Sequence, residues 1–255
     1  MKSGLYEVSP FILQNLIWVP TRFVYKFFAH FKIRGGENLS GLPKGVIFAV
    51  NHSSELDPIT LTGALPFMSR FYPMFYVSRE KSFYKKSGWR QKIYGGLFFK
   101  AWGAYPAYPG LKNYSQSLIN HIKLLIDSKS VCIFPEGVRT KNGTIGDGKG
   151  GVAYLSWATG RPIVPVGING SFHCDIISFF SRKKHIGLTF GHPIYPRELF
   201  ARNGIEPTVG ENIDDFTDAA ALIMEQIKQL AGQANAIQES VPPLVPNFTA
   251  PLNKK

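Results

Sequence analysis

The stretch VIFAVNHSSELDP, at residues 46–58, indicates the class of fold. Its first five residues are apolar throughout, which is typical of a strand in a sheet that is covered on both faces. A polar loop with two serines follows, and a helical pattern then runs over residues 54–65. A buried strand that leads through a short polar loop into a helix is the repeating unit of an α/β protein.

The rest of the chain repeats this unit. Further runs of β-branched and aromatic residues predict strands at 74–77, 131–134, 163–166 and 187–190. Helical patterns lie between them, at 112–127 and 151–159. The alternation predicts an α/β fold with a mostly parallel sheet flanked by helices. We expect this domain over residues 37–232, with an acidic helix at about 214–231, and a proline-rich, disordered tail over 233–255.

Basic and aromatic residues dominate the composition. The chain of 255 residues carries a net charge of +12, and 14% of its residues are aromatic. Residues 70–100 contribute +7, from lysines and arginines that alternate with aromatic residues. Rings and long basic side chains are both favoured at an anionic membrane surface. The composition therefore favours a membrane with anionic lipids over nucleic acid, for which no motif is present. The alternative is a solvated basic face over an aromatic core.

Residues 1–36 have the same character, because apolar side chains recur there at helical spacing among basic residues. The apolar run over residues 8–21 is short and contains polar side chains, so it does not predict a transmembrane helix. We expect N-terminal amphipathic membrane-contact helices, divided into two at Pro20. The expected association is peripheral or monotopic, on the cytoplasmic face of a membrane.

His52 and Asp57 form the candidate catalytic pair. His52 lies in the loop after the first strand, and Asp57 lies in the first helical turn, where the helix dipole favours a carboxylate. Ends of strands are where open α/β sheets place their sites. If the loop folds back, the carboxylate can hold one imidazole nitrogen and leave the other free as a general base. The alternative is that Ser53 or Ser54 caps the helix and His52 is an ordinary loop residue.

Two later stretches add polar groups to strand ends. Residues 134–140, FPEGVRT, run from a strand into a loop with a carboxylate, a glycine and an arginine, whose planar fork suits a phosphate. The glycine-rich residues 143–150 satisfy part of a P-loop, but Gly150 stands where serine or threonine is required. We therefore interpret Lys149 as the cation of a flexible loop that reaches an anionic substrate.

Three motifs in order resemble those of the glycerolipid acyltransferase family: NH-x4-DP at 51–58, FPEG-x-RT at 134–140 and IVPV at 163–166. The resemblance covers about residues 40–200. It implies acyl transfer from acyl-CoA or acyl-carrier protein to a lipid hydroxyl at a membrane, with His52 as general base and Asp57 orienting it. The substrate-binding residues are then expected to be Glu136, Gly137, Arg139, Thr140 and Lys149.

The acceptor implied by the resemblance is a lysolipid, above all 1-acylglycerol-3-phosphate, which would yield phosphatidate. The family's second motif usually carries an arginine after a glycine, whereas residues 103–110 read GAYPAYPG and contain none. Either Arg139 and Lys149 hold the acceptor phosphate unaided, or the acceptor is a lyso-aminolipid or a lysophospholipid. A non-enzymatic membrane-binding module on the same fold is the remaining alternative.

Neither a metal nor a cofactor is expected. Two cysteines, Cys132 and Cys174, cannot form a four-ligand zinc site, and we expect both to be buried and inert. An acyl thioester already has a good leaving group, so a base and oxyanion donors suffice. We expect these donors among the backbone N–H groups near Gly137 or in residues 146–151. The other histidines, His121 among them, are assigned to the core or the surface.

Overall fold

The apolar strand of the opening stretch lies at the centre of a sheet. The structure is a computed structural model that describes residues 4–79, 97–108, 113–174, 179–182, 184–201 and 213–239. In this part of the chain, seven strands form one sheet in the order β1-β7-β6-β2-β5-β3-β4. Their bounds are β1 Lys32–Arg34, β2 Ile47–Val50, β3 Met74–Arg79, β4 Ala104–Ala107, β5 Ser130–Ile133, β6 Ile163–Asn169 and β7 Gly187–Phe190.

The sheet is mostly parallel, as the alternation of strands and helices predicted. Neighbouring strands pair in parallel everywhere except between β6 and β7, which are antiparallel. The five predicted strands are all present. The two that the sequence did not reveal, β1 and β4, lie at the edges of the sheet. β1 has only three residues, two of them exposed and basic, and β4 contains Pro106, which edge strands tolerate.

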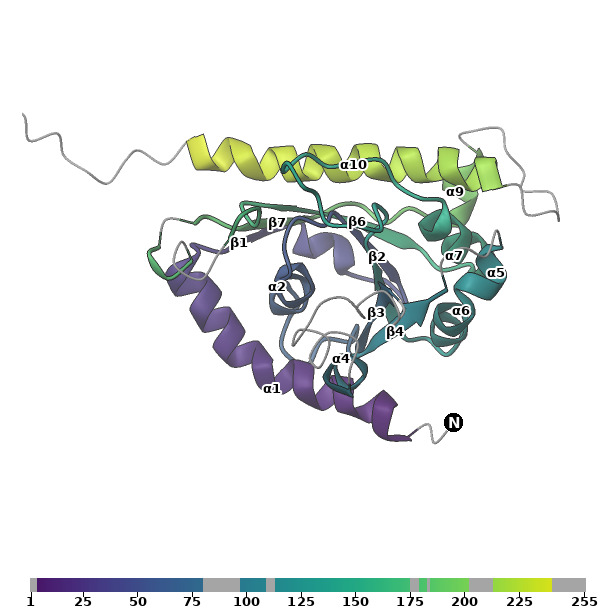
Figure 1. Ribbon diagram of the computed structural model, residues 1–255, viewed down its shortest axis with the longest axis horizontal. Helices are drawn as coiled ribbons and strands as arrows, with labels where there is room; N and C mark the ends of the chain where they lie inside the picture. The colour runs from purple at the N-terminus through teal and green to yellow at the C-terminus, as the bar shows by residue number, and fades with distance from the viewer. Residues whose placement is uncertain are drawn as a thin grey trace, which may run out of the picture.

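Helices cover both faces of the sheet (Figure 1). α10 lies along one face with α6, α7 and α9, and α1, α2 and α4 lie on the other, as two separate clusters of buried apolar residues confirm. The helices are α1 Gly4–Phe28, α2 Asp57–Ala64, α4 Leu97–Trp102, α5 Tyr114–Ser117, α6 Ile119–Ile126, α7 Gly151–Thr159, α9 Pro196–Ala201 and α10 Ile213–Glu239, with a 3-10 turn, η1, at Gly36–Leu39.

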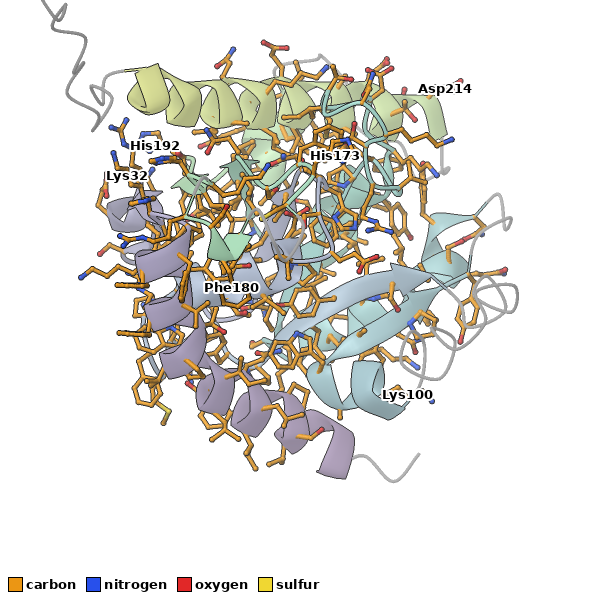
Figure 2. All side chains as sticks on the ribbon, turned by 60° about the vertical axis from the view of Figure 1, so that its left-hand side comes forward. Lys32, Lys100, His173, Phe180, His192 and Asp214 are labelled. Atoms are coloured by element: carbon orange, nitrogen blue, oxygen red, sulfur yellow. The ribbon has the colours of Figure 1, made fainter. Side chains whose placement is uncertain are left out.

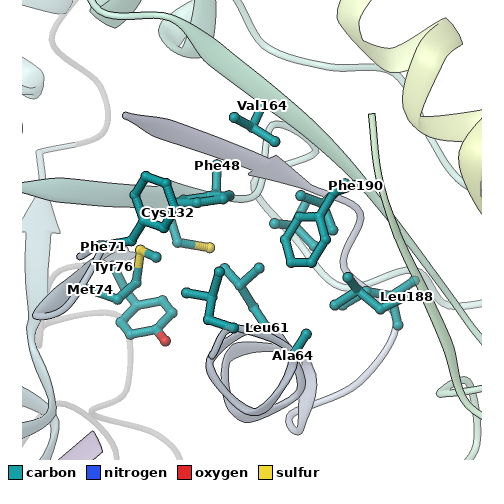
Figure 3. Close-up of a cluster of buried hydrophobic side chains, with 14 of the residues drawn as sticks. Phe48, Leu61, Ala64, Phe71, Met74, Tyr76, Cys132, Val164, Leu188 and Phe190 are labelled. Carbon is teal, nitrogen blue, oxygen red and sulfur yellow. The ribbon is translucent and has the colours of Figure 1, made fainter. Parts of the chain in front are cut away.

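β2 contributes side chains to both clusters. Phe48 and Val50 point toward α2, whereas Ile47 and Ala49 belong to the cluster under α7 and α10. Figure 3 shows Leu61 and Ala64 of α2 facing the sheet beside Phe48. A strand buried on both faces needs apolar residues at every position, which explains the unbroken apolar run in the sequence.

α1 is one continuous helix, so the prediction of two helices divided at Pro20 is wrong. Side chains anchor the helix on both sides of this proline. Gln14 Nε2 donates to the carbonyls of Met74 (2.7 Å) and Trp102 (2.9 Å), and Arg22 donates to the carbonyl of Gly63 (2.9 Å). These contacts hold both halves of α1 against the protein and outweigh the lost backbone hydrogen bond.

The acidic helix is also longer than predicted. α10 continues to Glu239, through residues expected in the disordered tail. The added stretch is rich in alanine and glutamine, which are good helix formers. The tail from residue 240 and the basic, aromatic residues 80–96 lie outside the described residues, so those two predictions are not tested. Within the described helices, none is both long and apolar enough to cross a bilayer.

Two cysteines and His121 test the predictions about buried side chains. Cys132 is buried as expected, whereas Cys174 is partly exposed, which corrects that prediction. His121 on α6 is fully buried, consistent with its assignment to the core. Burial lowers the pKa of His121 to about 4, although backbone groups of Tyr76 and Tyr105 oppose the shift. This histidine is therefore neutral in the folded protein at neutral pH.

We expect His121 to make stability depend on pH. An unfolded histidine titrates at a pH of about 6.5, whereas His121 in the folded protein titrates at about 4. Between these two pH values the unfolded chain binds this proton and the folded protein does not, so the free energy of unfolding falls as the pH falls. The loss is about 3 kcal/mol over this window. Urea unfolding at several pH values should show that the free energy of unfolding falls less steeply with falling pH in His121→Leu than in the wild-type protein. An equally steep loss in the variant would contradict this explanation.

Candidate active site

Two polar loops meet at the carboxyl ends of the central strands. β2 and β5 are parallel neighbours, with Ala49 opposite Ile133, so the loops that follow them leave the sheet side by side. The first loop carries His52 and leads to Asp57 at the start of α2. The second contains residues 134–140. The structure therefore brings together the two motifs that the sequence separates by about eighty residues.

Asp57 is the buried centre of the first loop. Its side chain is 0% exposed, and Oδ2 lies 3.0 Å from Nδ1 of His52. The same oxygen accepts hydrogen bonds from the backbone N–H groups of Ser53 and Ser54, both at 2.7 Å. Within the described part of the chain, Oδ1 has no hydrogen-bond partner. Leu56 is the N-cap residue of α2 and makes no side-chain cap, but the hydroxyl of Ser54 accepts the backbone N–H of Leu56 at 3.2 Å, so a serine does bind the start of the helix beside the contact between His52 and Asp57.

The contacts of His52 define its chemistry. A carboxylate can only accept, so Nδ1 carries the hydrogen toward Asp57 and Nε2 keeps its lone pair. The imidazole stacks on Phe134, with ring centroids 4.1 Å apart and planes at 20°. Its side chain is 20% exposed, so the ring is partly accessible to solvent. This is the geometry of a general base with a fixed orientation.

Glu136 connects the two loops. Its Oε1 accepts the backbone N–H of His52 at 2.7 Å, and its Oε2 accepts the N–H of Gly146 at 3.0 Å. The side chain is only 7% exposed. The sequence predicted Glu136 as a substrate-binding residue, whereas the structure places both of its oxygens on backbone donors. Its contacts hold the loop that carries His52.

The other predicted binding residues lie in the loop that follows β5. Arg139 forms an ion pair with Glu55 at 2.8 Å, and both side chains are partly exposed. The backbone N–H of Thr140 donates to the carbonyl of His52 at 2.9 Å. Gly137 has a positive φ of 69°, and a Cβ there would lie 3.1 Å from Nζ of Lys149. Arg139 and Lys149 thus place two exposed cations on the loop beside His52.

The expected oxyanion donors need correction at three positions. The N–H of Gly137 donates to the carbonyl of Phe134 at 2.9 Å, and that of Lys149 donates to Pro135 at 2.9 Å. The N–H of Gly146 is bound by Glu136. These donors hold the shape of the 134–149 loop. The sequence could not reveal this, because it does not show which backbone groups the folded loop pairs.

Asn51 is a structural residue of the site that we did not predict as such. Its amide donates to the carbonyl of Ile168 at 2.8 Å and accepts the N–H of the same residue at 2.7 Å. It thereby ties the end of β2 to the end of β6. Its place directly before His52 in the motif was the available signal. Glu55 was missed as well, and no local pattern links it to Arg139.

Comparison with known proteins identifies the family of this chain. Residues 30–169, more than half of the chain, match the acyltransferase family. The chain therefore belongs to this family, and its motifs place it with the glycerolipid acyltransferases. The fold agrees: the crystal structure of the 1-acyl-sn-glycerophosphate (LPA) acyltransferase PlsC from Thermotoga maritima has a TM-score of 0.57 and 16% identity, covering 90% of this chain and 83% of that one.

Two curated relatives carry a more specific name. A probable 1-acyl-sn-glycerol-3-phosphate acyltransferase from Mycoplasma pneumoniae is 27% identical over 128 residues, which are 50% of this chain and 46% of that protein. The chloroplastic 1-acyl-sn-glycerol-3-phosphate acyltransferase BAT2 from Brassica napus is 28% identical over 149 residues, 58% of this chain and 39% of that protein. The matched part spans less than half the length of each relative.

The contacts of Glu136 predict the effect of Glu136→Gln. An amide offers one acceptor oxygen, so either His52 or Gly146 loses the acceptor for its backbone N–H. We expect the free energy of unfolding in urea to fall by about 1–3 kcal/mol. The control is Glu55→Gln, which removes an exposed ion pair worth about 0–1 kcal/mol. Unchanged stability of Glu136→Gln, with only a raised KM for the acceptor, would instead support the role predicted from the sequence.

Proposed function

We propose that this protein is a membrane-associated O-acyltransferase, which moves a fatty acyl group from acyl-CoA or acyl-carrier protein to the hydroxyl of a lysolipid. The observation that carries the proposal is the 3.0 Å contact between His52 Nδ1 and the fully buried Asp57. It leaves Nε2 with its lone pair, on an imidazole that is 20% exposed just after β2. His52 is the general base in this proposal, and Asp57 orients it.

The reaction needs one base and no covalent enzyme intermediate. The acceptor hydroxyl gives its proton to Nε2 of His52 as its oxygen bonds to the thioester carbonyl carbon. The tetrahedral intermediate then collapses and the carbon–sulfur bond breaks. The leaving thiolate takes the proton from the imidazolium of His52. The products are the acylated lipid and a free thiol, and His52 returns to its starting state.

We propose 1-acylglycerol-3-phosphate as the acceptor and phosphatidate as the product. The names of the two curated relatives support this substrate. Lys149 and Arg139 are exposed on the loop that follows β5, and both are suitable partners for its phosphate, although Arg139 would have to exchange its ion pair with Glu55 for it. The absence of arginine from residues 103–110 favours the second candidate, a lyso-aminolipid or another lysophospholipid. Residues 104–107 of this stretch form β4, and residues 109–112 lie outside the described part.

The outer side of α1 supports contact with an anionic bilayer. Six large apolar side chains at spacings of three or four residues are each 46–69% exposed: Val8, Ile12, Leu16, Val19, Phe23 and Phe27. Phe180 extends this surface, since its exposed ring packs 4.9 Å from that of Phe28 beside α1 (Figure 2). Arg182 lies over the ring of Phe27 and adds a cation for anionic headgroups.

The pair at the site predicts the activity of two variants. We expect His52→Ala and Asp57→Asn to lower kcat by about 10²–10⁴-fold, because the first removes the base and the second removes its charged orienter. Thiol release from oleoyl-CoA or palmitoyl-CoA with a panel of lysolipids would measure this and identify the acceptor. Full activity of His52→Ala would refute the assignment of the base, and an inactive wild-type protein would refute the proposed reaction.

The apolar side of α1 predicts how the protein binds vesicles. We expect the double variant Leu16→Ser/Phe23→Ser to partition at least about tenfold more weakly onto vesicles of phosphatidylcholine and phosphatidylglycerol, because each large side chain contributes up to about 1.5–3 kcal/mol when buried. Leu222→Ser is the control, since Leu222 is exposed on α10, across the sheet from α1 (Figure 1). Equal partitioning of the double variant and wild type in sedimentation would exclude α1 as the contact.

A further inference from the structure

The inner side of α1 contacts α2, the helix that begins with Asp57. Trp18 Nε1 donates to the carbonyl of Leu65 at 2.8 Å, and Arg22 donates to that of Gly63 at 2.9 Å. The hydroxyls of Tyr25 and Thr60 lie 3.1 Å apart. Trp18, Arg22 and Tyr25 follow one another at spacings of four and three residues, so they lie on one face of α1.

These contacts supply hydrogen-bond donors for two carbonyl groups at the C-terminal end of α2. The last carbonyl groups of any helix have no partner within it, and the C-terminal end carries a partial negative charge. In α2 the donors for Gly63 and Leu65 come from α1, and one of them is a cation. Gly63 allows the close approach, because a Cβ there would lie 3.1 Å from Cγ2 of Thr21.

Two aromatic rings lie next to the guanidinium of Arg22. It lies 6.0 Å from the ring centroid of Trp18 and 5.8 Å from that of Phe31. An aromatic ring attracts a cation over its face, and two rings limit the positions the group can take. The contact between Arg22 and Gly63 is therefore part of a fixed arrangement.

Tyr25 carries the connection along α2 to its first turn. Thr60 Oγ1, next to the Tyr25 hydroxyl, also lies 3.0 Å from the carbonyl of Leu56, the residue before Asp57. Tyr25 is 4% exposed and packs edge to face on Phe31. A continuous path of contacts thus runs from α1 through Thr60 to the backbone that positions Asp57.

We propose that α1 couples membrane contact to catalysis: Trp18, Arg22 and Tyr25 are positioning residues that hold α2, and with it Asp57 and His52, in the working geometry. The inference rests on the proposed acyl transfer. It joins two faces of one helix, since the outer face carries the exposed apolar stripe and the inner face holds α2. In this proposal, a displacement of α1 displaces the three side chains that hold α2.

The test separates positioning from membrane binding and from stability. Tyr25→Phe and Arg22→Met are assayed with acyl-CoA and a lysolipid, and we expect kcat to fall by about three- to tenfold with KM and vesicle partitioning unchanged. Arg22→Lys keeps a cationic donor, so it should recover part of the rate lost in Arg22→Met. Ser156→Ala is the matched control, because it removes one buried hydroxyl, which bonds the carbonyl of Arg161 at 2.7 Å on the opposite face of the sheet. It should keep the wild-type kcat.

The outcomes are distinct. Wild-type kcat in both Tyr25→Phe and Arg22→Met would overturn the coupling while leaving the proposed function intact. Lost vesicle partitioning with unchanged kcat would also overturn it, because α1 would then only dock. An equal loss of kcat in Ser156→Ala would show a general effect of destabilisation and overturn it as well. An inactive wild-type protein would overturn the proposed function itself. Should Arg22→Met fail to fold, Tyr25→Phe removes a single hydroxyl and still decides the question.

Discussion

The structure of the site depends on the buried carboxylate of Asp57. One oxygen of this group accepts two backbone N–H groups and faces the imidazole of His52. A buried carboxylate is costly unless it is hydrogen-bonded, so the loop between β2 and α2 must take the one shape that supplies these donors. That shape determines which nitrogen of His52 is free. The chemistry and the local fold therefore follow from the same contact.

The sheet supplies the frame for this contact. Asn51 ties the end of β2 to β6, and Glu136 ties the loop of His52 to the loop after β5. On the other side, α1 holds the end of α2 through Arg22 and Trp18. Polar residues of this kind are expensive to bury singly, but each of these is paired with backbone groups that would otherwise lack partners. The result is that the loop of His52 and the helix of Asp57 are held from several directions.

Much of this could be predicted from local sequence, and the rest depends on contacts between distant residues. The apolar run before His52 predicts a central strand because burial on both faces requires it, and the pattern of strands and helices predicts the parallel sheet. Pro20 misled the prediction, since tertiary anchors outweigh its local effect. Glu136 has the residue type of a ligand-binding group, yet its partners are backbone N–H groups that only the folded loops bring near. The link between Tyr25 and Thr60 spans two helices and leaves no local pattern.

In the proposed site, Asp57 holds the imidazole of His52 so that Nδ1 carries the hydrogen and Nε2 keeps its lone pair. Nitrogen-15 NMR of the imidazole of His52 measures this directly, in the folded protein at a pH where the ring is neutral, with His52→Gln used to assign the signal. We expect a protonated Nδ1 and an unprotonated Nε2, and we expect Asp57→Asn to alter this distribution. A neutral ring with its hydrogen on Nε2 in the wild-type protein would contradict it.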